Sequence, residues 1–285
     1  MAERARPARA SRSKIQPLSA KKTGMKILIY AESGAGKTVL AASSPNALIL
    51  DADNGMASAA ALGLECDVWS VKDYKDLDEA YDFKRRAPEA KKYDWVWLDS
   101  ATLFQELGMD QIMQETVKRS PHRDPYVPDR LEYVRNQNHL SNWVRHMKAL
   151  PGNFGITALV TRIEDEDGDV MYVPAITGGG KIPMYAKMCG YMDIVGRLHV
   201  VRKKGEETRT RLLQTQEDGK FYAKDRFNVL GQMRDPAIPD LTDAVMNGRR
   251  RKTGNAESEV RRQRIRSKQG STGTAKESKT RTVRR

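Results

Sequence analysis

The sequence has few cysteines and no long apolar run. Its two cysteines, Cys66 and Cys189, are far apart and have no histidine pair nearby. This excludes a disulfide framework and a zinc cluster, so both thiols are predicted to be buried in the core. No run approaches the roughly eighteen apolar residues of a membrane-spanning helix, and the Arg-rich start lacks the features of a secretory signal. We therefore expect a soluble cytoplasmic protein without a membrane partner.

The net charge of +13 is concentrated at the two ends of the chain. Residues 1–24 contribute +6 and residues 248–285 contribute +11, which leaves −4 for residues 25–247. Both ends mix basic residues with small polar ones and cannot offset the entropy lost on ordering. They are predicted to be basic disordered tails that attract polyanions without reading sequence, or that only solubilise the chain. Residues 25–247 are expected to form the folded domain.

The pattern between the tails is that of an α/β fold. Short apolar runs alternate with longer amphipathic segments, which indicates a mostly parallel sheet covered by helices. Further along the chain, charged turns separate shorter runs, which predicts an antiparallel C-terminal hairpin extension. The predicted buried strands are Met25–Tyr30, Ala47–Leu50, Trp95–Leu98 and Phe154–Val160, and the predicted antiparallel strands are Val170–Val173, Ile194–Val201, Arg211–Thr215 and Phe221–Ala223.

A phosphate loop is the most specific motif in the sequence. The loop consists of Ala31, Glu32, Ser33, Gly34, Ala35, Gly36, Lys37 and Thr38. It follows a predicted strand and opens a helix, so backbone N–H groups and the helix dipole converge on bound phosphates. Lys37 is predicted to contact the β- and γ-phosphates, and the Thr38 hydroxyl to coordinate magnesium. Ala31 replaces the usual first glycine and is small enough for the turn. The predicted cofactors are ATP and Mg²⁺.

Acidic residues follow two of the buried strands. Asp99 ends the apolar run Trp95–Leu98 and is predicted to hold magnesium, although it could simply cap the next helix. Ser100 stands where many hydrolytic ATPases carry a catalytic glutamate, so the base must lie elsewhere. An attacking water needs a carboxylate on the strand next to the phosphate loop. Asp53 is the predicted base and Asp51 the reserve, with an Asp-rich turn as the structural alternative.

The order of these motifs resembles a known family. Ala31–Thr38, Leu50–Asp53 and Leu98–Ser100 together resemble the core of RecA-like recombinases. The segment Ile176–Ala186 is similar to the end of the RecA DNA-binding loop, and Ala223–Asn228 resembles the Lys-Asn-Arg-Phe-Gly motif of RadA-type ATPases. The whole is most similar to compact RecA-like ATPases of phages, which are grouped with single-strand annealing proteins.

The resemblance implies a RecA-like P-loop core that hydrolyses ATP, binds single-stranded DNA and promotes annealing or strand exchange in phage recombination. It also implies a homo-oligomer, either a filament or a ring, in the host cytoplasm. In such an assembly Lys224 and Arg226 reach the nucleotide of the neighbouring subunit, where a cation stabilises the transferring phosphoryl group. The chain departs from the family at Asp225 and Asn228, and at Asp53, which replaces a glutamate.

The DNA contacts also come from the resemblance. The implied DNA-binding residues are Gly178, Gly179, Gly180, Lys181, Tyr185 and Lys187. Here backbone N–H groups and lysines would contact phosphates, and Tyr185 would stack on a base. A single-strand DNA-binding protein is a further implied partner. The alternatives are a flexible hairpin connection at the glycines, a nucleotide-gated annealing scaffold with little turnover, and a P-loop kinase.

Overall fold

The computed structural model describes residues 24–164, 168–202 and 209–247. The predicted tail at 248–285 lies outside these residues, as does the tail at 1–24 apart from Gly24. The helices are α1 (Lys37–Ala42), α2 (Ala57–Ala61), α3 (Tyr74–Arg86), the 3-10 helix Pro88–Lys92, α4 (Ala101–Arg119), α5 (Arg130–Ala149) and α6 (Met184–Tyr191). Residues 238–247 are also helical.

A ten-stranded sheet forms the centre of the domain. The strands are β1 (Lys26–Ala31), β2 (Ala47–Asp51), β3 (Asp67–Ser70), β4 (Trp95–Asp99), β5 (Asn153–Glu164), β6 (Val170–Pro174), β7 (Ile194–Arg202), β8 (Arg209–Gln214), β9 (Lys224–Asp225) and β10 (Gln232–Arg234). The order along the sheet is β10-β8-β7-β1-β5-β4-β2-β3. The pairs from β7 to β3 are parallel, and β6, β8, β9 and β10 join antiparallel. The predicted mostly parallel sheet with an antiparallel extension is therefore confirmed.

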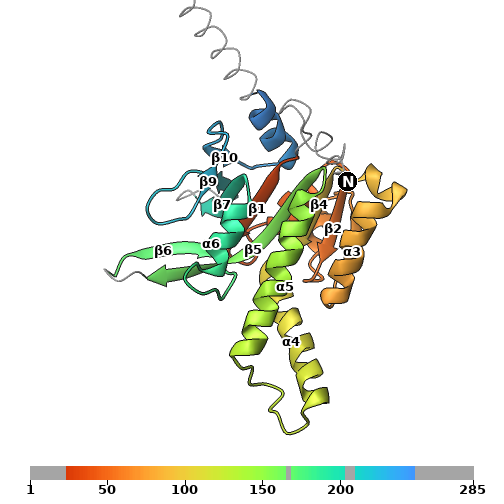
Figure 1. Cartoon of the computed structure of the whole chain (residues 1–285). Coiled ribbons are helices and arrows are strands. Elements are labelled where there is room, and N and C mark those ends of the chain that lie inside the picture. Colours follow the sequence, from red (N-terminus) through yellow and green to blue (C-terminus); the bar gives the residue numbers. More distant parts are fainter. Residues whose placement is uncertain (1–23, 165–167, 203–208, 248–285) are drawn as a thin grey trace, which may run out of the picture.

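Helices cover both faces of the parallel strands (Figure 1). Leu28 and Tyr30 of β1 join the core cluster that includes Leu77 of α3 and Trp143 of α5. The alternate residues of β1 face the other cluster, which α1 and helix 238–247 complete. Both faces are buried, which explains why the parallel strands are continuous apolar runs and do not alternate with polar residues.

Two hairpins extend past the carboxyl ends of the parallel strands. Ala31, the last residue of β1, pairs with Leu159, so the last five residues of β5 run on and pair with β6. This hairpin extends to the left of Figure 1. On the other side of β1, Tyr30 pairs with Arg197, and β7 continues to Arg202 while paired with β8. The phosphate loop thus leaves β1 between two projecting hairpins.

Three local predictions were wrong. Phe221–Ala223 is not a strand: Phe221 makes one isolated bridge to Tyr172, on which its ring stacks, and the short strand β9 comes after it. The strand beginning at Phe154 does not stop at Val160, because its polar end is held by β6 and needs no apolar cover. Cys66 is only half-buried, because it precedes β3 at the edge of the sheet, whereas Cys189 is buried as predicted.

Candidate functional site

The phosphate loop forms a turn that only glycine can complete at two positions. Gly34 and Gly36 have φ angles of +73° and +102°, which residues with a Cβ atom rarely adopt. Ala31 is buried at the end of β1 and is not among the residues with positive φ, so its side chain causes no strain. The loop then enters α1 at Lys37, as the sequence predicts.

Lys37 lies across the mouth of this loop. Its Nζ atom donates hydrogen bonds to the carbonyl oxygens of Ala31 at 3.3 Å and Glu32 at 3.1 Å. Burial lowers the pKa of Lys37, and the charges of Asp99, Asp53 and Glu32 oppose that shift. The ammonium group therefore sits among the carboxylates that the sequence assigned to the same site.

Asp99 is a buried carboxylate with one oxygen to spare. It is 1% exposed at the end of β4, and its Oδ1 atom accepts a hydrogen bond from Thr157. Its Oδ2 atom is buried and has no hydrogen-bond partner in the described part of the chain. Burial raises the pKa of Asp99, while the hydroxyls of Thr157 and Thr38 lower it. A buried oxygen without a partner beside the Thr38 hydroxyl fits a magnesium site.

The chain alone offers few ligands for such an ion. Among the described residues, no group of three or more His, Cys, Asp or Glu side chains could hold a metal. Magnesium is commonly bound by one or two protein oxygens together with substrate phosphates and water. Thr38 and Asp99 therefore match a metal that arrives with the nucleotide.

Asp51 and Asp53 have different surroundings. Asp51 is buried, and its Oδ1 atom accepts hydrogen bonds from the N–H groups of Asp53 at 3.0 Å and Gly55 at 3.4 Å, so it holds the turn together. Asp53 is exposed. A Cβ atom on Gly55 would lie 3.8 Å from both the Asp53 Cβ and the Thr38 Oγ1 atoms. Asp53 thus lies near Thr38, on which Asp99 also acts, and the charge of Asp53 reaches both Lys37 and Asp99.

The strand that precedes Asp53 is not next to the phosphate loop, so this part of the prediction was wrong. Strands β5 and β4 separate β2 from β1. Asp53 approaches the site because the loop after β2 returns toward α1, as the position of Gly55 between Asp53 and Thr38 shows.

Lys224 and Arg226 lie at the amino ends of the parallel strands, whereas the phosphate loop of the same chain lies at the carboxyl ends. Lys224 is the first residue of β9 and Arg226 follows it, and β9 pairs with the start of β7, which lies beside the start of β1. The Lys224 Nζ atom donates to the carbonyl of Cys189 at 2.8 Å, and Arg226 contacts Asp193 at 3.3 Å. They do not reach their own nucleotide site, and contact with the nucleotide of a neighbouring copy stays a prediction.

The glycine segment rests on the helices. The N–H of Gly179 donates to the side chain of Gln137 on α5 at 2.8 Å, and the N–H of Thr177 to Gln105 on α4 at 2.9 Å. Gly180 and Lys181 are exposed, whereas Lys187 is half-buried. Tyr185 packs on the core with its ring centroid 6.5 Å from that of Tyr222, so stacking on a base would require the ring to turn outward.

The arginines of the β7–β8 hairpin were not among the site residues predicted from the sequence. Arg211 lies against the phosphate loop: its Nε atom is 3.3 Å from the carbonyl oxygen of Ala35 and 2.7 Å from where a Cβ atom of Gly36 would be. A cleft of about 550 Å³ separates the first half of the loop from this hairpin. Its lining residues are Glu32, Ser33, Gly34, Ala35, Arg197, His199, Val200, Arg202 and Arg209. Two strands that contain four arginines and neither aspartate nor glutamate were the available signal.

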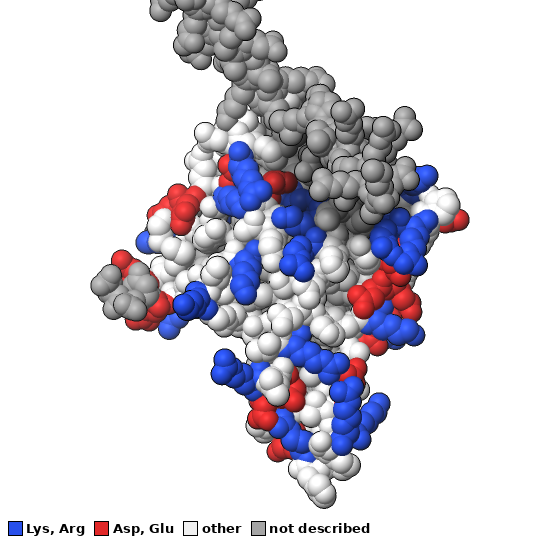
Figure 2. Space-filling model, in the orientation of Figure 1, with Lys and Arg blue, Asp and Glu red and all other residues white. Residues whose placement is uncertain are grey.

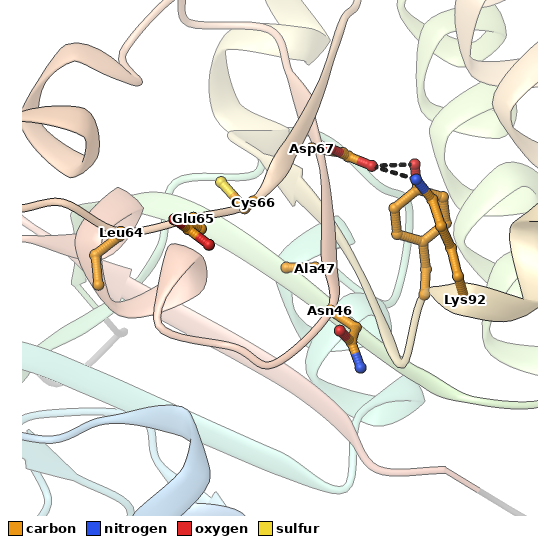
Figure 3. A pocket seen from close by; sticks show the side chains of 8 residues that line it. Asn46, Ala47, Leu64, Glu65, Cys66, Asp67 and Lys92 are labelled. Carbon is orange, nitrogen blue, oxygen red and sulfur yellow. Dashed lines mark hydrogen bonds and ion pairs between the residues drawn. The ribbon is translucent and has the colours of Figure 1, made fainter.

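A second pocket, of about 430 Å³, does not belong to this site (Figure 3). It is lined by residues at the starts of β2 and β3, including Cys66, at the edge of the sheet away from the phosphate loop. On its rim Asp67 accepts hydrogen bonds from Lys92 at 2.7 Å and Tyr93 at 2.6 Å, drawn as dashed lines in Figure 3.

The parallel sheet, the loop between β1 and α1, and the pair Thr38 and Asp99 define a P-loop nucleoside triphosphatase. Within that class the chain belongs to the AAA domain family, whose model matches residues 23–227. Domains of this type generally bind nucleotide with Mg²⁺, and the family suggests ATPase activity. No curated protein matches the chain.

None of the helices in the described part is long and apolar enough to cross a membrane.

Proposed function

We propose that this protein is a RecA-like ATPase that hydrolyses ATP in response to single-stranded DNA and promotes annealing or strand exchange in phage recombination. The observation that carries the nucleotide part is the unpartnered, buried Oδ2 atom of Asp99 beside Thr38 and Lys37. A buried carboxylate oxygen without a partner is costly, and a cation brought by the nucleotide removes that cost.

Each residue of the site has a defined part in this proposal. The backbone N–H groups of the loop and the Lys37 ammonium bind the phosphates. Thr38 and Asp99 hold Mg²⁺, which when bound neutralises the phosphate charge that builds up during transfer. Asp53, exposed beside Thr38, orients the attacking water and accepts its proton.

The DNA part of the proposal has separate support. The order of the motifs resembles RecA-like ATPases, and Lys181 stands exposed next to the glycine segment. The two basic ends of the sequence add +17 charges in total, from +6 and +11, and such charge attracts a polyanion.

Phosphate release measured with and without single-stranded DNA tests both parts. We expect ATP hydrolysis by the wild type, faster with DNA, and loss of about a hundredfold or more in Lys37→Ala and Asp99→Asn. Asp110→Asn, an exposed carboxylate on α4, is the matched control and should keep full activity. A wild type that binds no ATP contradicts the whole proposal. An equal rate of hydrolysis with and without DNA contradicts only the DNA part. Transfer of phosphate to a small acceptor without release of free phosphate would indicate a kinase.

One observation favours a second candidate, a nucleotide-gated annealing scaffold with little turnover. Asp53 is exposed, and its side chain is one carbon shorter than the glutamate of the RecA-like ATPases that the sequence resembles. The shorter side chain lengthens the distance from the carboxylate to the attacking water. In that case annealing of complementary strands should proceed with a nonhydrolysable ATP analogue, and Asp53→Ala should leave annealing unchanged. Annealing that stops in either condition would exclude the scaffold.

A further inference from the structure

The β7–β8 hairpin stands beside the phosphate loop as a projecting arm. Tyr30 of β1 pairs with Arg197, and the remaining five residues of β7 pair only with β8 among the described strands. At about 3.3 Å per residue, the arm projects about 16 Å beyond that pairing. The last three residues of β7, Val200 to Arg202, are exposed on the side of the sheet where the phosphate loop lies.

The charged residues on the two described strands of this arm are all basic, and the segment that joins them adds Lys203, Lys204, Glu206 and Glu207 in the sequence. Its two strands contain four arginines and a histidine but no aspartate or glutamate. Arg202 and Arg209 are direct cross-strand partners on the same face, a position where like charges are destabilising. Within the described ranges, neither arginine has a carboxylate at ion-pair distance.

The charges on the helical hairpin are arranged differently. Figure 2 shows basic and acidic residues side by side over the lobe that α4 and α5 form. Arg123 pairs there with Asp129 and Glu132, and Arg135 pairs with Glu115. The lack of ion pairs at Arg202 and Arg209 within the described ranges is thus a local feature and does not reflect the described surface as a whole.

The cleft beside the arm is separate from the place where the β- and γ-phosphates bind. Its lining includes Glu32–Ala35 of the loop but not Lys37, Thr38, Asp53 or Asp99. Apolar and aromatic groups border the basic ones: Val200 is 38% exposed, and the Arg197 guanidinium lies 3.4 Å above the Phe221 ring. The Nδ1 atom of His199, which also lines the cleft, is buried without a hydrogen-bond partner in the described part.

We propose that this cleft binds the phosphodiester backbone of single-stranded nucleic acid, with Arg202 and Arg209 contacting successive phosphates. A phosphate between the two guanidinium groups relieves their cross-strand repulsion. A row of several cations is complementary to the successive phosphates of a nucleic-acid strand. A single bound nucleotide does not require these arginines, because Lys37 already contacts its phosphates. The bound strand would touch Glu32–Ala35 directly, which links nucleic acid to the nucleotide site. This inference rests on the proposed function and names its DNA surface.

The test uses the full chain and a fluorescent oligo-dT, with binding measured by anisotropy over a range of salt concentrations. For a single strand, the slope of log K against log salt falls by about 0.7 for each phosphate that the protein no longer neutralises. We expect the double variant Arg202→Gln/Arg209→Gln to lower the slope by about 1.4. Arg202→Lys/Arg209→Lys should restore the slope, because lysine keeps the charge.

The matched control is Arg85→Gln/Arg86→Gln on α3, which removes the same charge from an exposed helix where both arginines pair with Asp82. Its slope should equal that of the wild type. A fluorescent ATP analogue, titrated in parallel, should bind wild type and double variant equally, and it reports on the proposed nucleotide site independently. The inference is overturned if the wild type does not bind oligo-dT, if both double variants lower the slope equally, or if the arm variant weakens the ATP analogue and leaves oligo-dT binding unchanged.

Discussion

Arg211 shows how one side chain can set the direction of a backbone N–H group. The carbonyl of Ala35 and the N–H of Gly36 belong to one planar trans peptide and point in opposite directions. Arg211 donates from the β8 side to that carbonyl at 3.3 Å, so the Gly36 N–H points away from Arg211. Asp235 holds Arg211 in place by accepting its backbone N–H at 2.9 Å.

We therefore expect Arg211→Ala to weaken ATP binding by about tenfold, the effect of removing one hydrogen bond from a charged donor. Arg211→Lys keeps a donor and should recover part of the affinity. Titration with a fluorescent ATP analogue measures both, and Arg145→Ala on α5 is the control for removal of an exposed arginine. Equal affinity in wild type and Arg211→Ala would show that the loop holds its shape without this contact.

The buried Asp99 predicts a stability that depends on pH. Burial raises the pKa of this carboxyl, so the protonated form is favoured in the folded state. Its contribution to stability is fully present below the unfolded pKa and is lost as pH rises through the raised folded pKa. At neutral pH the charged side chain therefore destabilises the protein when no cation is bound.

Without nucleotide or metal, Asp99→Asn should raise the midpoint of thermal unfolding at pH 8, and the gain should shrink toward acid pH. A gain of about 1 kcal/mol corresponds to about 2–4 °C in a domain of this size. Thermal scans from pH 5 to pH 8 measure it. If Asp99→Asn changed the midpoint by the same amount at every pH, titration of Asp99 would not be the cause of the change.

At the scale of elements, the α4–α5 hairpin depends on its capping residues. Helix α5 begins at Arg130, and Asp129 is its N-cap in a capping box, in which the Asp129 N–H donates to Glu132 at 2.8 Å. Asp129 followed three residues later by Glu132 is the local sequence pattern of such a helix start.

Asp129→Ala should lower the free energy of unfolding by about 0.5–2 kcal/mol, the usual cost of removing an N-cap. Denaturant titration measures this decrease. ATP binding should not change, because the side-chain partners of Asp129, which are Arg123 and Glu132, are not residues of the nucleotide site. Asp110→Ala within α4 provides the control for removal of one exposed carboxylate, and an equal decrease there would argue against the capping role.

At the scale of the whole molecule, Lys224 and Arg226 raise the question of assembly. Both lie at the amino edge of the parallel strands, whereas the phosphate loop lies at the carboxyl edge. A head-to-tail contact between copies would bring these two edges together, and such a contact generates a ring or a filament.

Mixing two inactive variants tests this arrangement. Lys37→Ala lacks the loop lysine, and Lys224→Ala/Arg226→Ala lacks the predicted finger. If the finger acts in trans, a one-to-one mixture should regain about a quarter of the wild-type ATPase rate, because a random quarter of the contacts pairs an intact loop with an intact finger. ATPase assays of the mixture over a range of protein concentrations measure it. If the mixture recovers no activity, or if Lys224→Ala/Arg226→Ala is fully active alone, these two residues do not supply the cation that acts on the neighbouring nucleotide.

The sequence by itself determined the parts of this protein that depend on neighbouring residues. These parts are the phosphate loop between β1 and α1, the apolar strand that ends in Asp99, and the two-sided burial of the parallel sheet. They depend on local backbone geometry and on apolar runs, so short stretches of sequence carry them.

Only the tertiary structure decided which distant residues complete the site. The strand order put β5 and β4 between β1 and β2, which overturned the reason for choosing Asp53 although Asp53 still lies beside Thr38. Arg211 contacts Ala35 across 176 residues of sequence. Pairings of such separation follow from how the strands pack together, and no local pattern encodes them.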